Sequence, residues 1–226
     1  MDRSLAFRED HGHESSLPQE EWEGSPRGIA YSEFNHALAG IGVIMVGLSE
    51  LRSGLGWTIW PWVGFLLPIG MLTSGIYLLI WSDHEAWPIG PLSLAQTLSG
   101  NDMEMFQHKI FAVLLLSIGL IEWRVRRGRL QDRGWSLALP GFAIIGGLLL
   151  FMHMHGPHPS AQRIAMHHFL MGALALGAAS VRFVGEYVES GYGREERRVR
   201  RSVFLLIWSV LILHMGCQLV FYSETS

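Results

Sequence analysis

Apolar residues along this 226-residue chain fall into six long blocks instead of alternating with polar ones. Each block has roughly 18 to 25 mostly uncharged residues, the length that a helix needs to cross a hydrocarbon layer about 30 Å thick. The pattern predicts an all-α fold, a polytopic membrane bundle of about six transmembrane helices. The predicted spans cover residues 34–51, 57–81, 106–123, 136–155, 164–184 and 202–222.

The polar ends of the chain flank one predicted membrane domain. Residues 34–222 contain all six spans. Residues 1–33 are polar and acidic with few large apolar side chains, so we predict a disordered N-terminal tail. Residues 223–226 form a short C-terminal tail. Tryptophans such as Trp57, Trp81 and Trp123 mark the ends of spans, where an amphipathic ring prefers the headgroup layer.

Arginine is concentrated in two links between predicted spans. Residues 124–133 and 194–201 are rich in arginine, and they lie on one side of the membrane if the spans alternate. Short arginine-rich loops stay in the cytoplasm, so both termini are predicted to lie outside. The link formed by residues 82–105 carries carboxylates but no basic residue. We predict that it faces the periplasm of a bacterial inner membrane.

All 11 histidines fall on the predicted outer side of the membrane. A single histidine at the end of a span is usually a polar residue that reaches water, but ionisable groups within spans are expected to be functional. Sulfur atoms gather at the same level. Residues three apart share a helix face, and this spacing joins Met105 to His108, and His168 to Met171.

Imidazole, thioether and thiol groups together suit copper, particularly Cu(I), whereas zinc seldom takes methionine. Methionine is also a common filler of apolar cores. We predict a copper site close to the outer surface, with zinc held by histidines and Asp83 or Glu85 as an alternative. The predicted ligands are His36, His108, His153, His155, His167, His168, His214, Met105, Met152, Met154, Met171, Met215 and Cys217.

The segment FMHMHGPHP, residues 151–159, ends the fourth predicted span and contains three imidazoles. On a regular helix the side chains of His153 and His155 point about 200° apart. Both could reach one ion only where the helix unwinds, so we expect one of the two per ion.

Three segments resemble the copper resistance D (CopD) family of bacterial inner-membrane proteins. They are FNHALAGIGVIMVG, MLTSGIYLLIW and HKIFAVLLLSIGLIEWRVRRGRL, and they cover the first three spans. FMHMHGPHP and MHHFLMG have no counterpart in that pattern. The resemblance implies copper handling at or across the membrane, with His36 and His108 as matching positions. A periplasmic copper-binding or redox protein is the partner that this role implies.

Other functions stay open. Haem b held by two histidines, such as His36 with His108 or His168 with His214, would make the chain an electron-transfer protein. A membrane metalloenzyme is less favoured, because the sequence contains no recognisable reaction motif. A further hypothesis is that the chain is a structural subunit of a larger complex. Nucleic acid is an unsuitable partner, since the arginine runs are short and act as topology signals.

Overall fold

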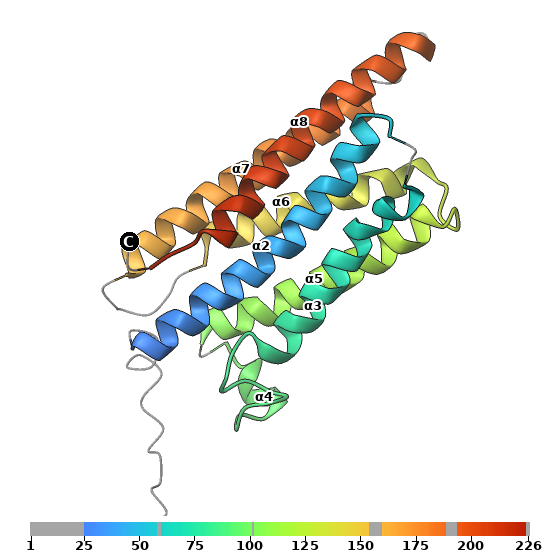
Figure 1. The fold of residues 1–226 in the computed structure, drawn as a ribbon. Coiled ribbons are helices and arrows are strands. Elements are labelled where there is room, and N and C mark those ends of the chain that lie inside the picture. Colours follow the sequence, from blue (N-terminus) through green and yellow to red (C-terminus); the bar gives the residue numbers. More distant parts are fainter. Residues whose placement is uncertain (1–24, 58–59, 101, 154–159, 189–193, 225–226) are drawn as a thin grey trace, which may run out of the picture.

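The computed structural model describes residues 25–57, 60–100, 102–153, 160–188 and 194–224. Six helices in these segments are long and apolar enough to cross a membrane, which confirms the predicted bundle. In chain order the helices are α2 (Pro26–Gly54), α3 (Leu66–Trp81), α5 (Met103–Arg126), α6 (Ala138–Phe151), α7 (Ala161–Val188) and α8 (Arg194–Val220). The spans of α3 and α6 also include the turns before them and begin at Pro61 and Gly134. A four-residue helix, α4 (Leu94–Thr97), lies between α3 and α5 beyond one end of the bundle (Figure 1).

The first transmembrane helix begins eight residues before the predicted boundary at residue 34. Ser25 accounts for the earlier start, because its Oγ accepts a hydrogen bond from the backbone N–H of Gly28 at 3.1 Å and caps the helix. Pro26 follows in the first turn, where its missing N–H costs no helical hydrogen bond. Residues 1–24 lie outside the described part of the chain.

Proline lies near the start of two other spans. Short 3₁₀ turns, η1 (Pro61–Phe65) and η2 (Arg133–Leu137), lead into α3 and α6. Pro68 and Pro140 then fall in the first turn of their helices. The first four N–H groups of a helix have no intrahelical acceptor, so proline is tolerated at these two positions.

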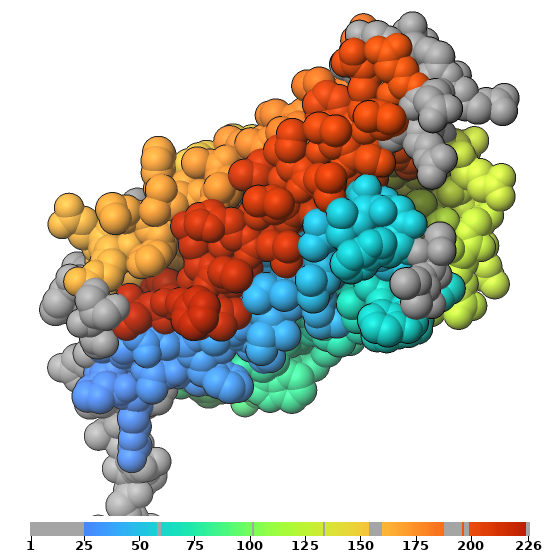
Figure 2. All heavy atoms as spheres, turned by 45° about the horizontal axis from the view of Figure 1, so that its top comes forward, coloured from blue at the N-terminus to red at the C-terminus, as the bar shows by residue number. Residues whose placement is uncertain are grey.

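The six helices form a ring, in which each packs against two neighbours. The order around the ring is α2, α3, α5, α6, α7 and α8. Figure 2 shows α8 lying along α2 on one side and α7 on the other. The contact between α5 and α6 is the least extensive of the six. The ring therefore has one weak seam.

Glycine lets neighbouring helices approach closely, as is common in membrane bundles. A Cβ on Gly40 would lie 2.8 Å from the backbone oxygen of Gly216, so α2 and α8 touch there without intervening side chains. Gly147 and Gly172 make a similar contact between α6 and α7. The exposed apolar side chains, Ile41, Val113 and Leu148 among them, face outward from the ring. This arrangement suits a lipid environment.

One end of the bundle is cross-linked by charged side chains. The carboxylate of Glu50, only 3% exposed, accepts hydrogen bonds from Arg126 on α5 at 2.7 Å and from Arg182 on α7 at 3.1 Å. Glu122 and Glu186 lie within 3.4 and 3.7 Å of those two arginines. Three helices that are far apart in sequence are thus joined at this end, which we call the arginine end.

Candidate metal centre

The opposite end of the bundle brings together histidines from four different segments. His36 comes from α2, His108 from α5 and His168 from α7, while His153 lies two residues beyond the end of α6. We call these four residues the histidine layer. His153 and His168 are buried, at 5% and 3% exposed. The chain has already left the helix at His153, so its ring is not restricted to the face that a regular helix would give it.

The rings of the histidine layer form a row in space, in which each ring contacts the next. The ring centroids of His108 and His153 are 5.2 Å apart, those of His153 and His168 are 4.5 Å apart, and those of His168 and His36 are 5.7 Å apart. All four imidazoles therefore belong to one continuous cluster.

Hydrogen bonds fix the orientation of two of these rings. Nδ1 of His36 lies 2.8 Å from the carbonyl oxygen of Ser32, and Nδ1 of His108 lies 2.9 Å from Oδ1 of Asp83. A carbonyl and a carboxylate can only accept, so in both rings Nδ1–H is the donor. In the neutral ring Nε2 then carries the lone pair that a metal ion binds.

His153 is held in the same way by a glutamine. Its Nδ1 lies 2.6 Å from Oε1 of Gln107. The amide of Gln107 is itself oriented, because its Nε2 donates to the carbonyl oxygen of Met152 at 3.2 Å. Oε1 is therefore the atom that faces His153, and Nδ1–H is again the donor. Outer hydrogen bonds of this kind orient metal-binding histidines in known metal sites.

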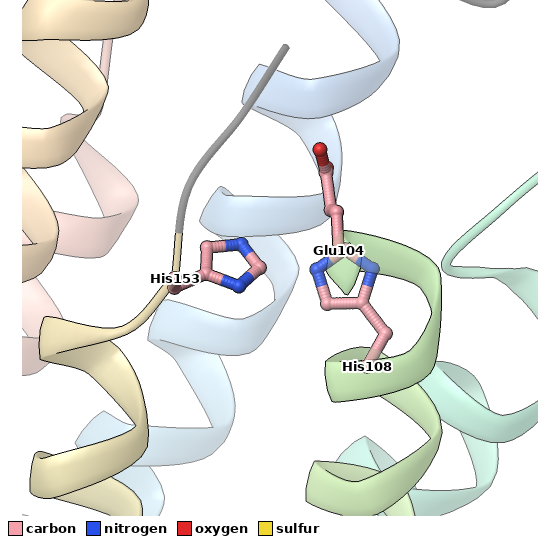
Figure 3. Close-up of side chains that lie close together, drawn as sticks. All are labelled: Glu104, His108 and His153. Atoms are coloured by element: carbon pink, nitrogen blue, oxygen red, sulfur yellow. The ribbon is translucent and has the colours of Figure 1, made fainter. Parts of the chain in front are cut away.

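Glu104 completes a group that could hold a metal ion. One ligand atom from each of Glu104, His108 and His153 lies within 4.8 Å of the other two. Figure 3 shows the two rings facing each other across a gap, with the carboxylate beside it. Ligands about 2.1 Å from one ion at tetrahedral angles are about 3.4 Å apart, so the donor atoms need to approach by at most about 1.4 Å.

A buried ion pair supports His108 from behind. Asp83 lies between His108 and Lys109, whose Nζ is 3.6 Å from Oδ2 of Asp83 and donates to the carbonyl oxygen of Leu79 at 3.0 Å. Burial alone would raise the pKa of Asp83, but the charges of His108 and Lys109 and hydrogen bonds from His108 and Ser82 lower it below its ordinary value. Asp83 is therefore ionised at neutral pH.

A cavity with several charged side chains in its wall, which we call the vestibule, lies between the histidine layer and the nearer end of the bundle. This cavity of about 140 Å³ is lined by His36 and His108 and by several carboxylates. The acidic residues of its wall are Asp83, Glu85, Glu104 and Glu224. A cleft lined by one sign of charge raises the local concentration of the opposite ion, so the vestibule favours cations.

An apolar cavity lies on the other side of the same layer, toward the middle of the bundle. It has a volume of about 240 Å³ and is bordered by all four histidines at one end. The remaining wall consists almost entirely of apolar side chains and glycines, and the cavity continues along the bundle as far as Val46, Leu139 and Trp208. The histidine layer thus lies between a cavity with charged side chains in its wall and an apolar one.

The C-terminal segment closes over part of the layer. Tyr222 stacks on His36 with the ring centroids 4.0 Å apart, and its hydroxyl bonds to Glu224. Glu33 on α2 accepts from the backbone N–H of Glu224 at 2.9 Å, and Arg163 on α7 donates to the carbonyl oxygen of Glu224 at 3.1 Å. Burial, followed by the charge of Glu224, raises the pKa of Tyr222. The phenol stays protonated at neutral pH.

The structure gathers some of the predicted ligands and leaves others apart. His36, His108, His153 and His168 form the layer. The buried Met105 shares the vestibule wall with His108, and the buried Met171 and the half-buried Met215 share the apolar cavity. Other predicted positions lie at the rim, on the surface or outside the described residues. His167 contacts Tyr222, Met152 is 64% exposed, His214 and Cys217 are exposed on α8, and Met154 and His155 fall outside the described residues.

Two residues of the site, Glu104 and Gln107, were missing from the predicted ligand set. Glu104 stands four positions before His108 on one helix, a spacing that places both side chains on one face, so the sequence contained a usable signal. Gln107 gave no such signal, because its partner His153 is 46 positions away.

Comparison with protein-family models, curated proteins and solved structures finds no match. The resemblance to the copper resistance D family stays a prediction. The function must be inferred from the geometry of the site.

Proposed function

We propose that this membrane protein binds a transition-metal ion, copper, in the histidine layer. His108 and His153 are the central ligands, with Glu104 and His168 beside them. The observation that carries the proposal is the shared setting of three imidazoles, in which Nδ1 of His36, His108 and His153 donates to a fixed acceptor. Because Nδ1 carries the proton, Nε2 of each neutral ring has the lone pair that can bind a metal ion. Metal-binding histidines are commonly oriented by such hydrogen bonds.

Copper is the ion that the surroundings favour. Imidazole suits copper, zinc, iron and nickel alike, but divalent copper binds most strongly to a given set of such donors. The buried thioethers of Met105 and Met171 lie in the walls of the two cavities that border the layer. Thioether is a donor for Cu(I), so a site with both donor types could hold either oxidation state.

The vestibule gives the ion a route to the layer from the aqueous side. Its carboxylates attract cations, and His84 and Glu85 stand in its wall, 3.9 Å apart. We further propose that the histidine end faces the periplasm of a bacterial inner membrane. In this orientation the arginine end obeys the rule that basic loops stay in the cytoplasm. The protein would then receive copper from the periplasm for storage or delivery.

Haem b is less well supported than a single ion. A cavity of about 240 Å³ is smaller than the 300–1,000 Å³ that is usual for drug-sized ligands, and haem is larger than most of these. The predicted haem pair of His168 and His214 is also unfavourable, because His214 is exposed on α8 and its ring lies against Gln218.

Metal content is the direct test. The protein is purified in detergent from cells grown with equal concentrations of copper, zinc and iron, and metals are measured by mass spectrometry together with the visible spectrum. We expect one copper per chain in the wild type. Alanine at His108 or His153 should reduce it at least tenfold, whereas His214→Ala is a matched control that should retain it.

The alternative outcomes are distinct. Wild-type protein without stoichiometric metal, or unchanged metal in both ligand variants, would refute the proposed site. Zinc or iron in place of copper would keep the site and refute the choice of ion. A Soret band would favour haem b.

A further inference from the structure

The apolar cavity beneath the histidine layer is unusual in a bundle whose helices otherwise pack through glycine contacts. Protein interiors contain few voids larger than a water molecule. This cavity has a volume of about 240 Å³. On α2 it runs from His36 to Val46, a length of about 15 Å at the rise of an α-helix.

The wall of this cavity determines what could occupy it. Below the imidazoles it is formed by aliphatic and aromatic side chains and by small residues, including Gly146 and Ala143. Water needs two to four polar partners in a buried site, and an apolar cavity of about 150 Å³ in another protein stays dry and binds benzene. The larger cavity here suits an uncharged apolar molecule with one or two rings.

The weak seam of the ring provides a way in from the bilayer. Phe111 and Leu115 on α5 and Phe142 on α6 are half-buried and line the cavity, and they lie on the two helices that contact each other least. A Cβ on Gly146 would meet only the Cε1 atom of Phe111, at 3.6 Å. Neither helix presents a glycine that brings the two backbones together at this seam, in contrast to the contact of Gly147 with Gly172 between α6 and α7.

We propose that the apolar cavity is a binding site for a lipid-soluble, uncharged molecule of one or two rings, which enters between α5 and α6 and lies against the histidine layer. The same imidazoles border the cavity and the proposed metal centre, so the bound molecule touches the metal ligands. The metal site is thereby accessible to a cation from the vestibule and to an apolar molecule from the membrane. Binding in the cavity does not require the ion.

The test uses the full chain, stripped of metal by a chelator, in detergent micelles with hexafluorobenzene as the probe. Fluorine NMR separates probe bound to protein from probe in empty micelles. We expect a saturable bound signal of one probe per chain. Gly146→Leu places a side chain in the cavity without a backbone clash and should weaken binding at least tenfold. Gly177→Leu should bind as the wild type does, because Gly177 is exposed and a Cβ there meets no atom within 4 Å.

Ala143→Leu is a second variant that fills the cavity, and it is used in case Gly146→Leu does not fold. Size-exclusion profiles show whether each variant is folded. If neither variant folds, the wild-type measurement still decides. A wild-type spectrum identical to that of empty micelles would overturn the proposal. Unchanged binding in a folded filling variant would do the same, and so would a Soret band, which would assign the cavity to haem. Loss of copper binding alone leaves this inference intact, because the experiment is done without metal.

Discussion

Replacing Asp83 with asparagine tests whether the hydrogen bond behind His108 tunes the proposed metal centre. The substitution preserves the size of the side chain and removes one negative charge at 2.9 Å from Nδ1 of His108. A hydrogen bond to a carboxylate is roughly twice as strong as one between neutral groups. Lys109 retains its bond to the carbonyl oxygen of Leu79, so it is not left without an acceptor.

The expected effect on metal affinity is large enough to measure. Loss of such an outer partner typically weakens metal binding 10- to 100-fold, which corresponds to about 1.4–2.7 kcal/mol. Both the wild type and Asp83→Asn are titrated with Cu(I) at pH 7 in competition with a coloured chelator. The dissociation constant should rise by that factor in the variant. Thermal unfolding of the metal-free proteins checks that both are folded.

Glu85→Gln is the matched control. Glu85 lies in the same vestibule wall and loses the same charge, but its carboxylate is paired with His84, at 3.9 Å, and not with a residue of the histidine layer. Its substitution should change the dissociation constant by less than about threefold, the effect of a weak, partly exposed charge. An equal loss of affinity in the two variants would refute the reasoning, because the vestibule's overall charge would then explain the effect.

Three further predictions concern stability. Glu50→Ala removes the buried carboxylate between Arg126 and Arg182, which keep only their contacts with Glu122 and Glu186. The loss of hydrogen bonds to a charged group should lower the free energy of unfolding by about 1.5–3 kcal/mol. Glu196→Ala, which breaks an exposed pair, should lower it by less than about 1 kcal/mol in the same detergent titration. Gly216→Leu would place Cβ 2.8 Å from a neighbouring side chain on α2 and should reduce the yield of folded protein on size exclusion, unlike Gly177→Leu. The lowered pKa of Asp83 means that its ionised form stabilises the folded chain above its ordinary pKa of about 3.9, and that this stability is lost as the pH falls through the lower folded value. Thermal unfolding between pH 6 and pH 3 should therefore show a steeper decline in the wild type than in Asp83→Asn.

The six helices could be predicted because hydrophobic length is a local property of the chain. The depth of each histidine in the membrane could be predicted as well, because its position along a span determines its depth. The direction in which each ring points could not be predicted. His214 lies at a depth close to that of the layer, but Gly216 faces α2, and residues two apart on a helix point about 200° apart. The packing of α8 against α2 therefore turns His214 outward.

The partners of the histidines were also beyond prediction from a single sequence. Gln107 reaches His153 only because α6 ends at Phe151 and the chain then departs from the helix. The stacking of Tyr222 on His36 depends on the C-terminal segment being tied to α2 and α7. Contacts of this kind arise from the ends of helices, where hydrophobic periodicity contains no information.

The cross-linked carboxylate Glu50 would limit where an ion bound in the histidine layer could go. Ahead of the imidazoles lie the hydrocarbon side chains around Trp208 and Leu139, and behind these Glu50 ties Arg126 to Arg182. To reach the far face, an ion would have to cross the apolar cavity and these side chains and then break the two ion pairs of Glu50. If the histidine layer binds an ion as proposed, this architecture favours its release back through the vestibule over its passage across the membrane.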